Sequence, residues 1–511
     1  MSGRDQGGRK PGAGKAGGAR PAGGKAAGGK AAGGKAAGSR SAAGKTGSGP
    51  VRTGAAATAA ASAAASAARA QPPGDGARRS GAPLRRQGPL RVPPLPGGLV
   101  GATRTLLDQV LTFEAPADTV VSRFFRAHPQ LGHRDRGLIA EAVYMVLRRK
   151  LEFAQYAQSG SGPLAHRLAL LGLAFTAGIE PVTSWAGVRD TDWLRPVLQI
   201  GRASLAFETR CNLPAWLLQA LRTRLSDAEI WDLTEALNRP APLDLRVNAI
   251  QLERPAALAA LAAAGVAGAA TPLAPAGIRL AGKPALQNLE LFQSGALEVQ
   301  DEGSQLLAHL VAPRRGELVI DFCAGAGGKT LALGALMKNT GRLYAMDVSA
   351  HRLGKLKPRL ARSGLSNVHP VAIDSERDPK LKRMAGKADR VLVDAPCSGL
   401  GTLRRNPDLK WRQTPDSVAE MNARQAAILD AASRLVRPGG RLVYATCSLL
   451  TAENTAVVDA FLAAHPEFSR ADARALLASQ HIVLETGADL ELWPHRHGTD
   501  GFYAAVLERA G

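Results

Sequence analysis

Two short stretches decide the fold of this chain: VLVDAPCSG at residues 391–399 and LVYATCS at residues 442–448. Each begins with an apolar run typical of a buried parallel strand and continues into a loop that carries a cysteine. In a doubly wound sheet, ligands and reactive groups collect beyond the carboxyl ends of the strands. We therefore expect the two cysteines, Cys397 and Cys447, to lie in one site.

The chain around these stretches alternates between strand and helix patterns from Val299 onward. Such alternation predicts an α/β fold with a parallel sheet and right-handed crossovers. Strands are expected at 318–322, 343–346, 371–373, 391–393 and 442–445. Helices are expected between them, for instance at 350–361 and at 417–436, the second closed by the PGG of residues 438–440.

Residues 99–235 show helical periodicity and predict an all-α domain. One apolar stripe contains Leu106, Leu107, Val110 and Leu111, and a second begins at Leu138. Basic residues flank the second stripe and suggest either a basic face or an ordinary solvated one: Arg134, Arg136, Arg148, Arg149 and Lys150. Residues 236–296 contain strand, helix and strand signals at 243–248, 254–264 and 277–280, which predict a small α/β module.

The first 98 residues form a basic, low-complexity tail of Gly, Ala, Ser and Lys. They hold 17 Lys and Arg against 2 Asp and Glu, a net charge of +15 out of +22 for the whole chain. So little apolar surface predicts a disordered segment. The tail would serve either as a nonspecific RNA-binding arm or as a solvated linker.

The four cysteines, Cys211, Cys323, Cys397 and Cys447, do not have the spacing of a zinc site, so we expect no metal. So few cysteines in 511 residues are typical of a reduced, cytoplasmic protein. No apolar run approaches the ~20 residues that span a bilayer, so a membrane protein is not expected. We expect a monomer.

A glycine-rich turn, DFCAGAGGKT at residues 321–330, follows the first strand of the series. A P-loop would need glycine at Cys323, and the dinucleotide fingerprint would need a small residue at Thr330, so neither motif is complete. The glycines instead let a ligand approach the backbone, with the N–H groups of the next helix directed at a carboxylate. The candidate ligand-binding residues here are Cys323, Ala324, Gly325, Ala326, Gly327, Gly328 and Lys329.

Acidic residues end the next two strands. Asp347 follows Gly327 by twenty residues, the spacing at which a carboxylate can bind ribose hydroxyls. Asp374 ends the third strand, where it would reach an adenine amine. A nucleoside with a carboxylate and no phosphate fits these groups, and S-adenosylmethionine is such a molecule. Each aspartate by itself could equally be a helix cap or a loop residue.

Paired thiols suit methyl transfer to carbon 5 of cytosine. A thiolate that adds at carbon 6 makes carbon 5 nucleophilic, and loss of the carbon-5 proton then releases the thiol. This chemistry needs a thiolate, an acid near the ring and a second base, which Cys447, Asp394 and Cys397 could supply. The alternative is that both cysteines are small buried hydrophobes.

Four motifs carry a resemblance to a known family: DFCAGAGGKT at 321–330, DAPCSGLGTLRRNPDLKW at 394–411, TCS with the following EN at 446–454, and HGTDGFYAA at 497–505. They resemble the Sun/NSUN family of RNA 5-methylcytosine methyltransferases, most closely its bacterial 16S rRNA members of the RsmB/Sun type. The resemblance covers residues 100–511. It implies a NusB-like RNA-binding domain within 99–235, an RNA-binding module at 236–296 and a Rossmann-like class I methyltransferase domain at 297–511.

The resemblance also implies roles for individual residues. Cys447 would be the nucleophile, Cys397 would assist breakdown of the adduct, and Asp394 would contact the target base. Lys329 would border the active site. Gly325, Gly327, Asp347, Asp374 and Asp394 would lie at the cofactor, S-adenosylmethionine. The loop departs from the family at Ala326, where proline is usual.

Further residues carry weaker signals. Arg404, Arg405, Lys410 and Trp411 could bind RNA phosphate and stack a base, or could form a plain surface loop. His497 is expected to order its loop. RNA, most of all rRNA, is the expected partner. The alternatives are a tRNA cytosine methyltransferase, or a ribosome-assembly factor with an inactive methyltransferase domain; a nicotinamide dehydrogenase would explain neither thiol.

Overall fold

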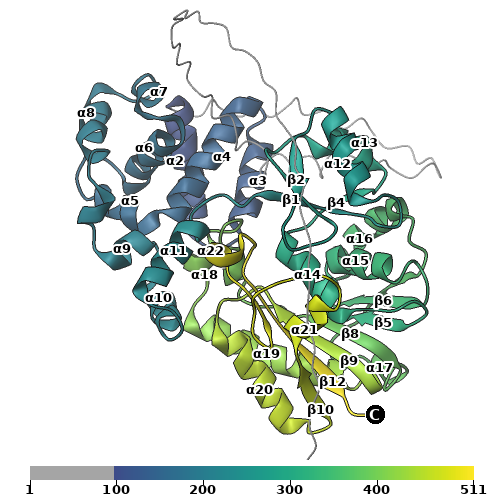
Figure 1. Cartoon of the computed structure of the whole chain (residues 1–511). Helices are drawn as coiled ribbons and strands as arrows, with labels where there is room; N and C mark the ends of the chain where they lie inside the picture. Colours follow the sequence, from purple (N-terminus) through teal and green to yellow (C-terminus); the bar gives the residue numbers. More distant parts are fainter. Residues whose placement is uncertain (1–96) are drawn as a thin grey trace, which may run out of the picture. The chain divides into compact units, whose positions relative to one another are not determined.

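The computed structural model describes residues 97–511 (Figure 1). Apart from its last two residues, the predicted basic tail lies outside this described part. The described residues form three successive parts: a helical part, a small module and an α/β part. Within residues 97–511, no helix has both the length and the apolar character needed to cross a bilayer.

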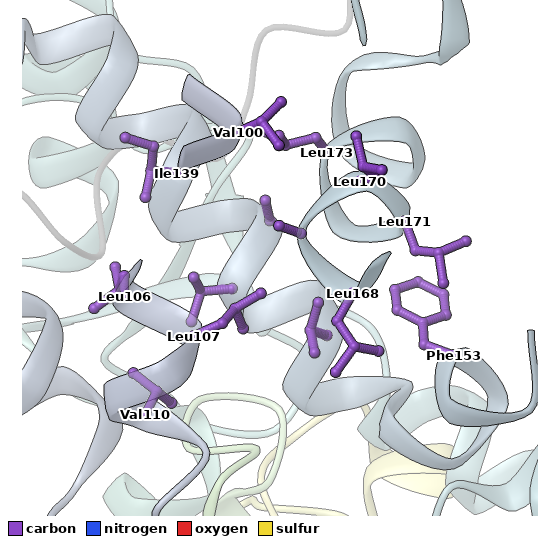
Figure 2. Close-up of a cluster of buried hydrophobic side chains, with 14 of the residues drawn as sticks. Val100, Leu106, Leu107, Val110, Ile139, Phe153, Leu168, Leu170, Leu171 and Leu173 are labelled. Atoms are coloured by element: carbon purple, nitrogen blue, oxygen red, sulfur yellow. The ribbon is translucent and has the colours of Figure 1, made fainter. Parts of the chain in front are cut away.

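The first part is entirely helical, as its apolar stripes predict. Leu107 of α2, Ile139 of α4 and Leu170 of α6 are fully buried in one cluster (Figure 2). The helices are α2 (Gly98–Val110), α3 (Ala117–Ala127), α4 (His133–Arg148), α5 (Lys150–Tyr156), α6 (Leu164–Ala177), α7 (Ile179–Thr183), α8 (Val188–Val197), α9 (Phe207–Cys211), α10 (Ala215–Arg222) and α11 (Asp227–Leu237), with the 3₁₀ turn η1 (Arg202–Ser204).

The small module is built on a four-stranded antiparallel sheet of order β2-β3-β1-β4. Its elements are β1 (Leu243–Val247), α12 (Arg254–Ala263), β2 (Gly268–Ala270), β3 (Gly277–Leu280), η2 (Leu286–Asn288), α13 (Glu290–Gln293) and β4 (Leu297–Val299). The strand, helix and strand expected from the sequence coincide with β1, α12 and β3. β4 begins at Leu297, the first residue expected for the catalytic domain, and it pairs with β1.

The α/β part contains a mixed sheet of order β10-β12-β9-β8-β5-β6-β7, with β11 paired to β12. β5 to β9 are mutually parallel, whereas β12 is antiparallel to β9 and to β10. The strands are β5 (Leu318–Asp321), β6 (Arg342–Asp347), β7 (Val368–Ala372), β8 (Ala388–Asp394), β9 (Val436–Thr446), β10 (Phe468–Ala471), β11 (Leu490–Leu492) and β12 (Phe502–Arg509).

Helices cover both faces of this sheet, and alternate strand residues face each layer. Val319 and Val443 share a core with α14, α15 and α21, whereas Ile320 and Leu442 share another with α19 and α20. The helical elements are α14 (Glu302–Val311), α15 (Gly328–Leu336), α16 (Ala350–Ser363), α17 (Pro379–Lys382), η3 (Leu400–Thr402), α18 (Leu409–Arg412), α19 (Pro415–Ser433), η4 (Thr451–Glu453), α20 (Thr455–Ala464), α21 (Ala473–Ala478) and α22 (Pro494–His497).

The predicted series of five parallel strands and their helices is confirmed, with two corrections. The sheet is not purely parallel, because β10, β11 and β12 extend it with antiparallel pairs. The helix expected to run to residue 436 ends at Ser433, and β9 already begins at Val436.

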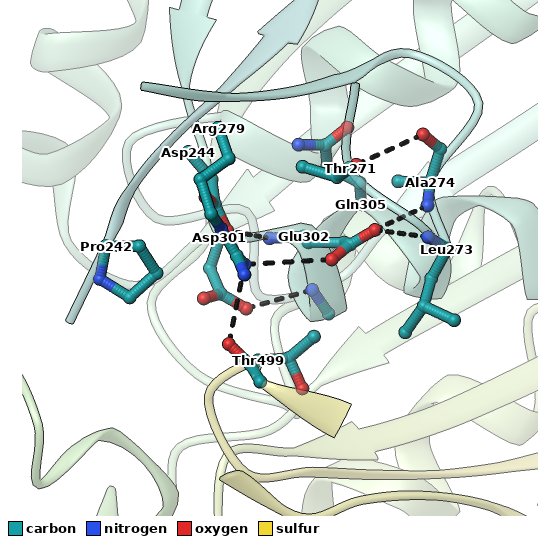
Figure 3. Close-up of polar contacts among 12 residues, drawn as sticks. Pro242, Asp244, Thr271, Leu273, Ala274, Arg279, Asp301, Glu302, Gln305 and Thr499 are labelled. Atoms are coloured by element: carbon teal, nitrogen blue, oxygen red, sulfur yellow. Dashed lines mark hydrogen bonds and ion pairs between the residues drawn. The ribbon is translucent and has the colours of Figure 1, made fainter. Parts of the chain in front are cut away.

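An ion pair and two backbone hydrogen bonds to Glu302 join the module to the α/β part (Figure 3). Arg279 of β3 donates to both carboxylate oxygens of Asp244 on β1, at 2.7 and 2.8 Å, and lies 3.7 Å from Glu302 of α14. Glu302 is fully buried and also accepts the backbone N–H groups of Leu273 and Ala274 at 2.5 and 2.8 Å. The start of α14 is therefore fixed to the module.

Candidate active site

The candidate site lies beyond the carboxyl ends of the parallel strands, as a doubly wound sheet predicts. β5 pairs with β8 and β6, and β8 pairs with β9, so the loops that follow these strands meet at one edge. Asp394 of β8 is the register partner of Ala445 of β9. Each strand continues from that rung into a cysteine loop. We call residues 394–411 the Pro-Cys loop and residues 446–454 the Thr-Cys loop.

The two cysteines are in contact. Their sulfur atoms are 3.3 Å apart, and the backbone N–H of Cys447 donates to the sulfur of Cys397 at 3.3 Å. Both residues are partly buried. Contact with Cys447 and burial raise the pKa of Cys397 well above its usual range, and the charge of Glu453 adds to this effect. The Cys397 thiol is therefore harder to deprotonate than a thiol in water.

Lys329 and Asp394 form an ion pair beside the thiols. The Lys329 ammonium lies 2.7 Å from Asp394 Oδ2, with side chains 13% and 29% exposed. Burial alone would lower the pKa of Lys329, but Asp394, then Cys447 and Asp321, outweigh that effect and raise it. Lys329 is thus a permanent positive charge near the Cys447 sulfur. Phe502 of β12 lies 5.7 Å from the same ammonium, measured to the ring centroid.

The loop after β5 has the backbone that its glycines predict. Gly327 has a φ of +80°, and a β-carbon there would overlap the Leu356 side chain, so only glycine fits. α15 begins directly after Gly327 without a side-chain cap, which leaves its first N–H groups available to an anion. Arg359 donates to Ala326 O at 2.6 Å, and Arg246 of the module donates to Gly328 O at 2.7 Å.

Asp347 lies at the end of β6 against this loop. Its Oδ2 accepts the Gly325 N–H at 2.8 Å, while Oδ1 accepts the Ser349 N–H at 2.7 Å and pairs with Arg352 at 3.0 Å. Arg352 is half exposed, so its guanidinium can turn into solvent, while the buried Asp347 carboxylate keeps its two backbone N–H donors. The carboxylate, the uncapped helix and the glycine loop together fit a nucleoside that carries a carboxylate.

Asp374 and Cys323 are the less engaged members of the predicted set. Asp374 is exposed, two residues beyond the end of β7. Cys323 packs against the core beneath the sheet, and burial followed by the charge of Asp394 raises the pKa of its thiol. The Cys323 side chain is therefore a neutral packing group. Ala324 continues the turn, with its N–H donating to Met346 O at 2.8 Å.

Val348 is a residue that the sequence argument missed. It follows Asp347 directly, and its apolar side chain is 60% exposed. An exposed apolar side chain beside the candidate ligand-binding carboxylate of Asp347 offers a surface on which a flat base could pack. Its position immediately after the strand-end aspartate was the available signal.

The RNA-binding hypothesis for the end of the Pro-Cys loop is contradicted by where these side chains lie. Arg404 and Lys410 are only 6% and 2% exposed. The Lys410 ammonium donates to Arg148 O of α4 at 2.9 Å and to Asn238 Oδ1 at 3.1 Å. Trp411 donates its indole N–H to Leu147 O at 2.8 Å. These residues bind the helical part of the chain rather than present themselves to a ligand.

The predicted basic face of α4 lies partly in the same contact. Arg148 is 9% exposed and donates to Arg404 O at 3.2 Å, while Lys150 lies 4.8 Å from the Trp411 ring centroid. Arg134 remains exposed. The basic residues at the end of α4 and those of the Pro-Cys loop therefore meet each other, because apolar stems and backbone carbonyls bury their charges together.

A buried cluster of two arginines and two aspartates fixes the middle of the Pro-Cys loop. Arg404 lies 3.0 Å from Asp500 and 3.7 Å from Asp301, and Arg405 lies 2.6 and 2.9 Å from the same two carboxylates. Asp500 belongs to the HGTDGF stretch. In that stretch His497 accepts the Trp493 N–H at 2.9 Å, so its predicted role as a loop-ordering residue is confirmed.

Glu453 is the second residue that the sequence argument missed. It is fully buried below the cysteine loops and accepts hydrogen bonds from Ser398 and Ser448. The sequence contained it only as part of the EN pair after TCS. Nothing in the local pattern indicated that its carboxylate turns inward.

The chain is similar to known methyltransferases. Residues 308–508 match the family described as 16S rRNA methyltransferase RsmB/F, and residues 213–287 match the ferredoxin-like domain of RsmF/B-like methyltransferases. The probable ribosomal RNA small subunit methyltransferase B of Synechocystis is 32% identical over 77% of this chain and 95% of its own length. The corresponding protein of Vibrio cholerae is 32% identical over 75% of this chain and 92% of its own.

Solved structures give the same fold. The crystal structure of PH0851 covers 81% of this chain and 99% of its own, with a TM-score of 0.65 and 27% identity. That of NSun6 from Pyrococcus horikoshii with SFG covers 58% and 98%, with a TM-score of 0.52 and 22% identity. With a paired-thiol site at the expected strand ends, a Rossmann-like fold and these relatives, the chain belongs to the 16S rRNA methyltransferase RsmB/F family.

Proposed function

We propose that this chain methylates carbon 5 of a cytosine in small-subunit rRNA through a covalent adduct on Cys447. It is a methyltransferase by family, and its methyl donor is S-adenosylmethionine. The observation that carries the proposal is the 3.3 Å contact between the two sulfur atoms beside the Lys329–Asp394 pair. Relatives named for the small ribosomal subunit favour rRNA as the substrate.

The two thiols would have different tasks. As the family resemblance implies, Cys447 would be the nucleophile, and the Lys329 ammonium would favour a thiolate there. The Cys447 sulfur would bond to carbon 6 of the cytosine, and the electron pair of the ring double bond would shift to carbon 5. After methylation, a base would take the carbon-5 proton, the electron pair of that C–H bond would restore the ring double bond, and the C6–S bond would break to release the Cys447 thiolate, with Cys397 assisting this release.

Asp394 and Lys329 would act on the target base. Asp394 accepts from Lys329 but is 29% exposed, so one side of the carboxyl group can contact the ring. The base must leave its helix to reach thiols at a strand end. Phe502, close to the Lys329 ammonium, borders the same space.

The cofactor would lie along the loop after β5. S-adenosylmethionine would supply an electrophilic methyl group there. Asp347 would accept hydrogen bonds from ribose hydroxyls once Arg352 turns away, and the first N–H groups of α15 would bind the carboxylate. Asp374 would contact the adenine amine. Residues 323–328 would line the ligand mainly through their backbone.

The test is adduct trapping on RNA. Cys397→Ala should accumulate a covalent protein–RNA complex in the presence of S-adenosylmethionine, because release is slowed, and Cys447→Ala should form none. Cys211→Ala is the matched control, since this buried thiol belongs to α9 and not to the pair. Trapping by Cys447→Ala would reverse the assignment of the nucleophile.

Two alternatives are separable by the same RNA. An assembly factor with an inactive site would transfer no labelled methyl group to any RNA class, and a tRNA enzyme would label only the tRNA fraction. Bisulfite sequencing of total RNA from a deletion strain would identify the cytosine. If residues 1–95 bind RNA, their deletion should weaken RNA binding, mostly at low salt, and leave the modified cytosine unchanged.

A further inference from the structure

One buried carboxylate joins the two cysteine loops. Glu453 of η4 has no exposed surface. It accepts the Ser398 N–H at 2.8 Å and the Ser398 hydroxyl at 2.5 Å, and it also accepts the Ser448 hydroxyl. Gln425 of α19 donates a fourth hydrogen bond at 3.0 Å. Among residues 97–511, no cationic side chain forms an ion pair with Glu453, so neutral donors alone solvate it.

The two serines place this carboxylate directly behind the thiols. Ser398 follows Cys397, and Ser448 follows Cys447. Their hydroxyl oxygens are 3.3 Å apart, the same separation as the two sulfur atoms. The cysteine pair and the serine pair are therefore two rungs between the same two loops, and Glu453 accepts from both ends of the lower rung.

Glu453 is itself held firmly. Its backbone carbonyl accepts the Tyr444 hydroxyl at 2.8 Å, and Gln425, besides binding the carboxylate, donates to Pro396 O at 2.9 Å. The next residue, Asn454, donates to Ser448 O at 3.1 Å. A shift of this carboxylate would move the two serines that follow the thiols.

We propose that Glu453 is a positioning residue that holds the two cysteine loops in register and thereby sets the contact between Cys397 and Cys447. The proposal rests on the proposed function only in that methyl transfer uses this contact. Glu453 also acts through its charge, because it is one of the groups that raise the pKa of Cys397. A glutamine at this position keeps the volume but presents one acceptor oxygen and an NH₂ group to the four donors.

The first experiment needs no RNA. Cys397 and Cys447 of the full chain are alkylated with iodoacetamide under single-hit conditions across a pH series, and each site is followed by mass spectrometry. In Glu453→Gln the pH midpoint for Cys397 should fall, because a negative charge beside its thiol is lost. Glu420→Gln, an exposed glutamate on α19, should leave both midpoints unchanged.

The second experiment measures methyl transfer. Glu453→Gln should lower kcat by roughly tenfold to a hundredfold with an unchanged KM for RNA, since misplaced reacting groups cost rate rather than binding. Ser448→Ala removes only the Thr-Cys end of the link and should show a smaller loss of kcat in a folded protein. Glu453→Asp, which retains the charge, should restore the Cys397 midpoint.

The outcomes separate this inference from the proposed function. Glu453→Gln with unaltered alkylation midpoints and unaltered kcat, and only a lower Tm, would overturn the positioning role. A wild-type chain that methylates no cytosine would refute the proposed function, while the alkylation series would still decide what Glu453 does. If Glu453→Gln does not fold, Ser448→Ala with wild-type midpoints and kcat would overturn the inference.

Discussion

The Pro-Cys loop and the Thr-Cys loop carry equivalent thiols but are held in different ways. The Thr-Cys loop is fixed largely by hydrogen bonds within itself, such as that from Thr446 to Asn454 Oδ1 at 2.5 Å and that from Ser448 to the Glu453 carboxylate. The Pro-Cys loop is fixed by charged groups from distant segments, including Asp301, Asp500 and the helical part. One thiol is placed by its own strand end, the other by the whole chain.

The contact between the two thiols therefore depends on tertiary contacts of the Pro-Cys loop as well as on the sheet. The register of β8 and β9 brings the loops to the same edge, and backbone hydrogen bonds from Ala395 to Ala445 O and from Gly401 to Cys447 O, each 2.8 Å, tie the two loops together. Further along, the Pro-Cys loop also contacts α4, the module and the HGTDGF stretch. Changes far from Cys397 should therefore affect chemistry as much as changes beside Cys447.

The largest expected effect comes from Asp500→Ala. The change leaves the guanidinium groups of Arg404 and Arg405 with Asp301 alone, and removal of one partner from a buried ion-pair cluster costs about 3–5 kcal/mol. Urea unfolding should show this loss. Asp500→Asn, which keeps the volume and one acceptor, should lose less. A loss under ~1 kcal/mol would mean that the charged cluster does not fix the loop.

The pH dependence of the free energy of unfolding distinguishes titration of the buried Asp321 from titration of the ion pairs in the Pro-Cys loop. Burial raises the pKa of Asp321 to about 7, with Asp394 and Asp347 adding to the shift and Thr330 and Lys329 opposing it. A raised folded-state value means that the native chain keeps a proton which the unfolded chain has lost. Stability is then full below about pH 4 and falls as pH rises to about 7.

Asp321→Asn should remove most of this fall, which we expect to be roughly 2–4 kcal/mol between pH 4 and 8. The measurement is urea unfolding at several pH values. Asp374→Asn, at an exposed carboxyl group, is the control and should keep the wild-type slope. A variant at Asp321 that still loses stability over this range would assign the titration to the ion pairs of the Pro-Cys loop.

Thr446→Val tests the hydrogen bonds within the Thr-Cys loop. It leaves the buried Asn454 Oδ1 without its hydroxyl donor, which costs about 1–2 kcal/mol. Because Thr446 precedes Cys447, the rate of adduct formation should fall as well, whereas the Pro-Cys loop keeps its contacts. Limited proteolysis and single-turnover kinetics would check both. An unchanged rate would show that the Thr-Cys loop tolerates loosening at its first residue.

The smallest effect is expected at an exposed ion pair that also joins the helical part to the α/β part. Arg496 lies 2.6 Å from Glu229, with side chains 46% and 42% exposed. Arg496→Ala should change the free energy of unfolding by under ~1 kcal/mol, because water screens the pair. A loss as large as that of Asp500→Ala would show that any bridge between the parts matters, buried or not.

Much of the fold could be predicted because its strands are apolar and end in recognisable loops. β5, β6, β8 and β9 were expected within a few residues of where they lie, and their order made one edge the site. β12 was not expected as a strand: its first six residues are all buried, so no alternation marks it, and its antiparallel pairing with β9 is a long-range choice.

The candidate site was predictable where residue type and strand end coincide, as for Cys397, Cys447, Asp347 and Lys329. It was not predictable where a charge is satisfied by a distant segment. Lys410 is the kind of residue that often contacts RNA phosphate. Only the tertiary structure shows that its ammonium donates a hydrogen bond to a backbone carbonyl 262 residues away. Glu453 was missed for the same reason, since a local pattern does not say which way a carboxylate turns.

The buried Lys410 limits where the chain can be truncated. A fragment that begins at Leu297 would contain every strand of the large sheet, yet its Pro-Cys loop would lose Arg148 O, Asn238 and the N–H of Ala117, which donates to Asp408 at 3.2 Å. The Lys410 ammonium would then lose these partners, although the loop would keep its contacts with Asp301, Asp500 and Glu453. A chimaera of two relatives must therefore take α4 and the Pro-Cys loop from the same parent protein.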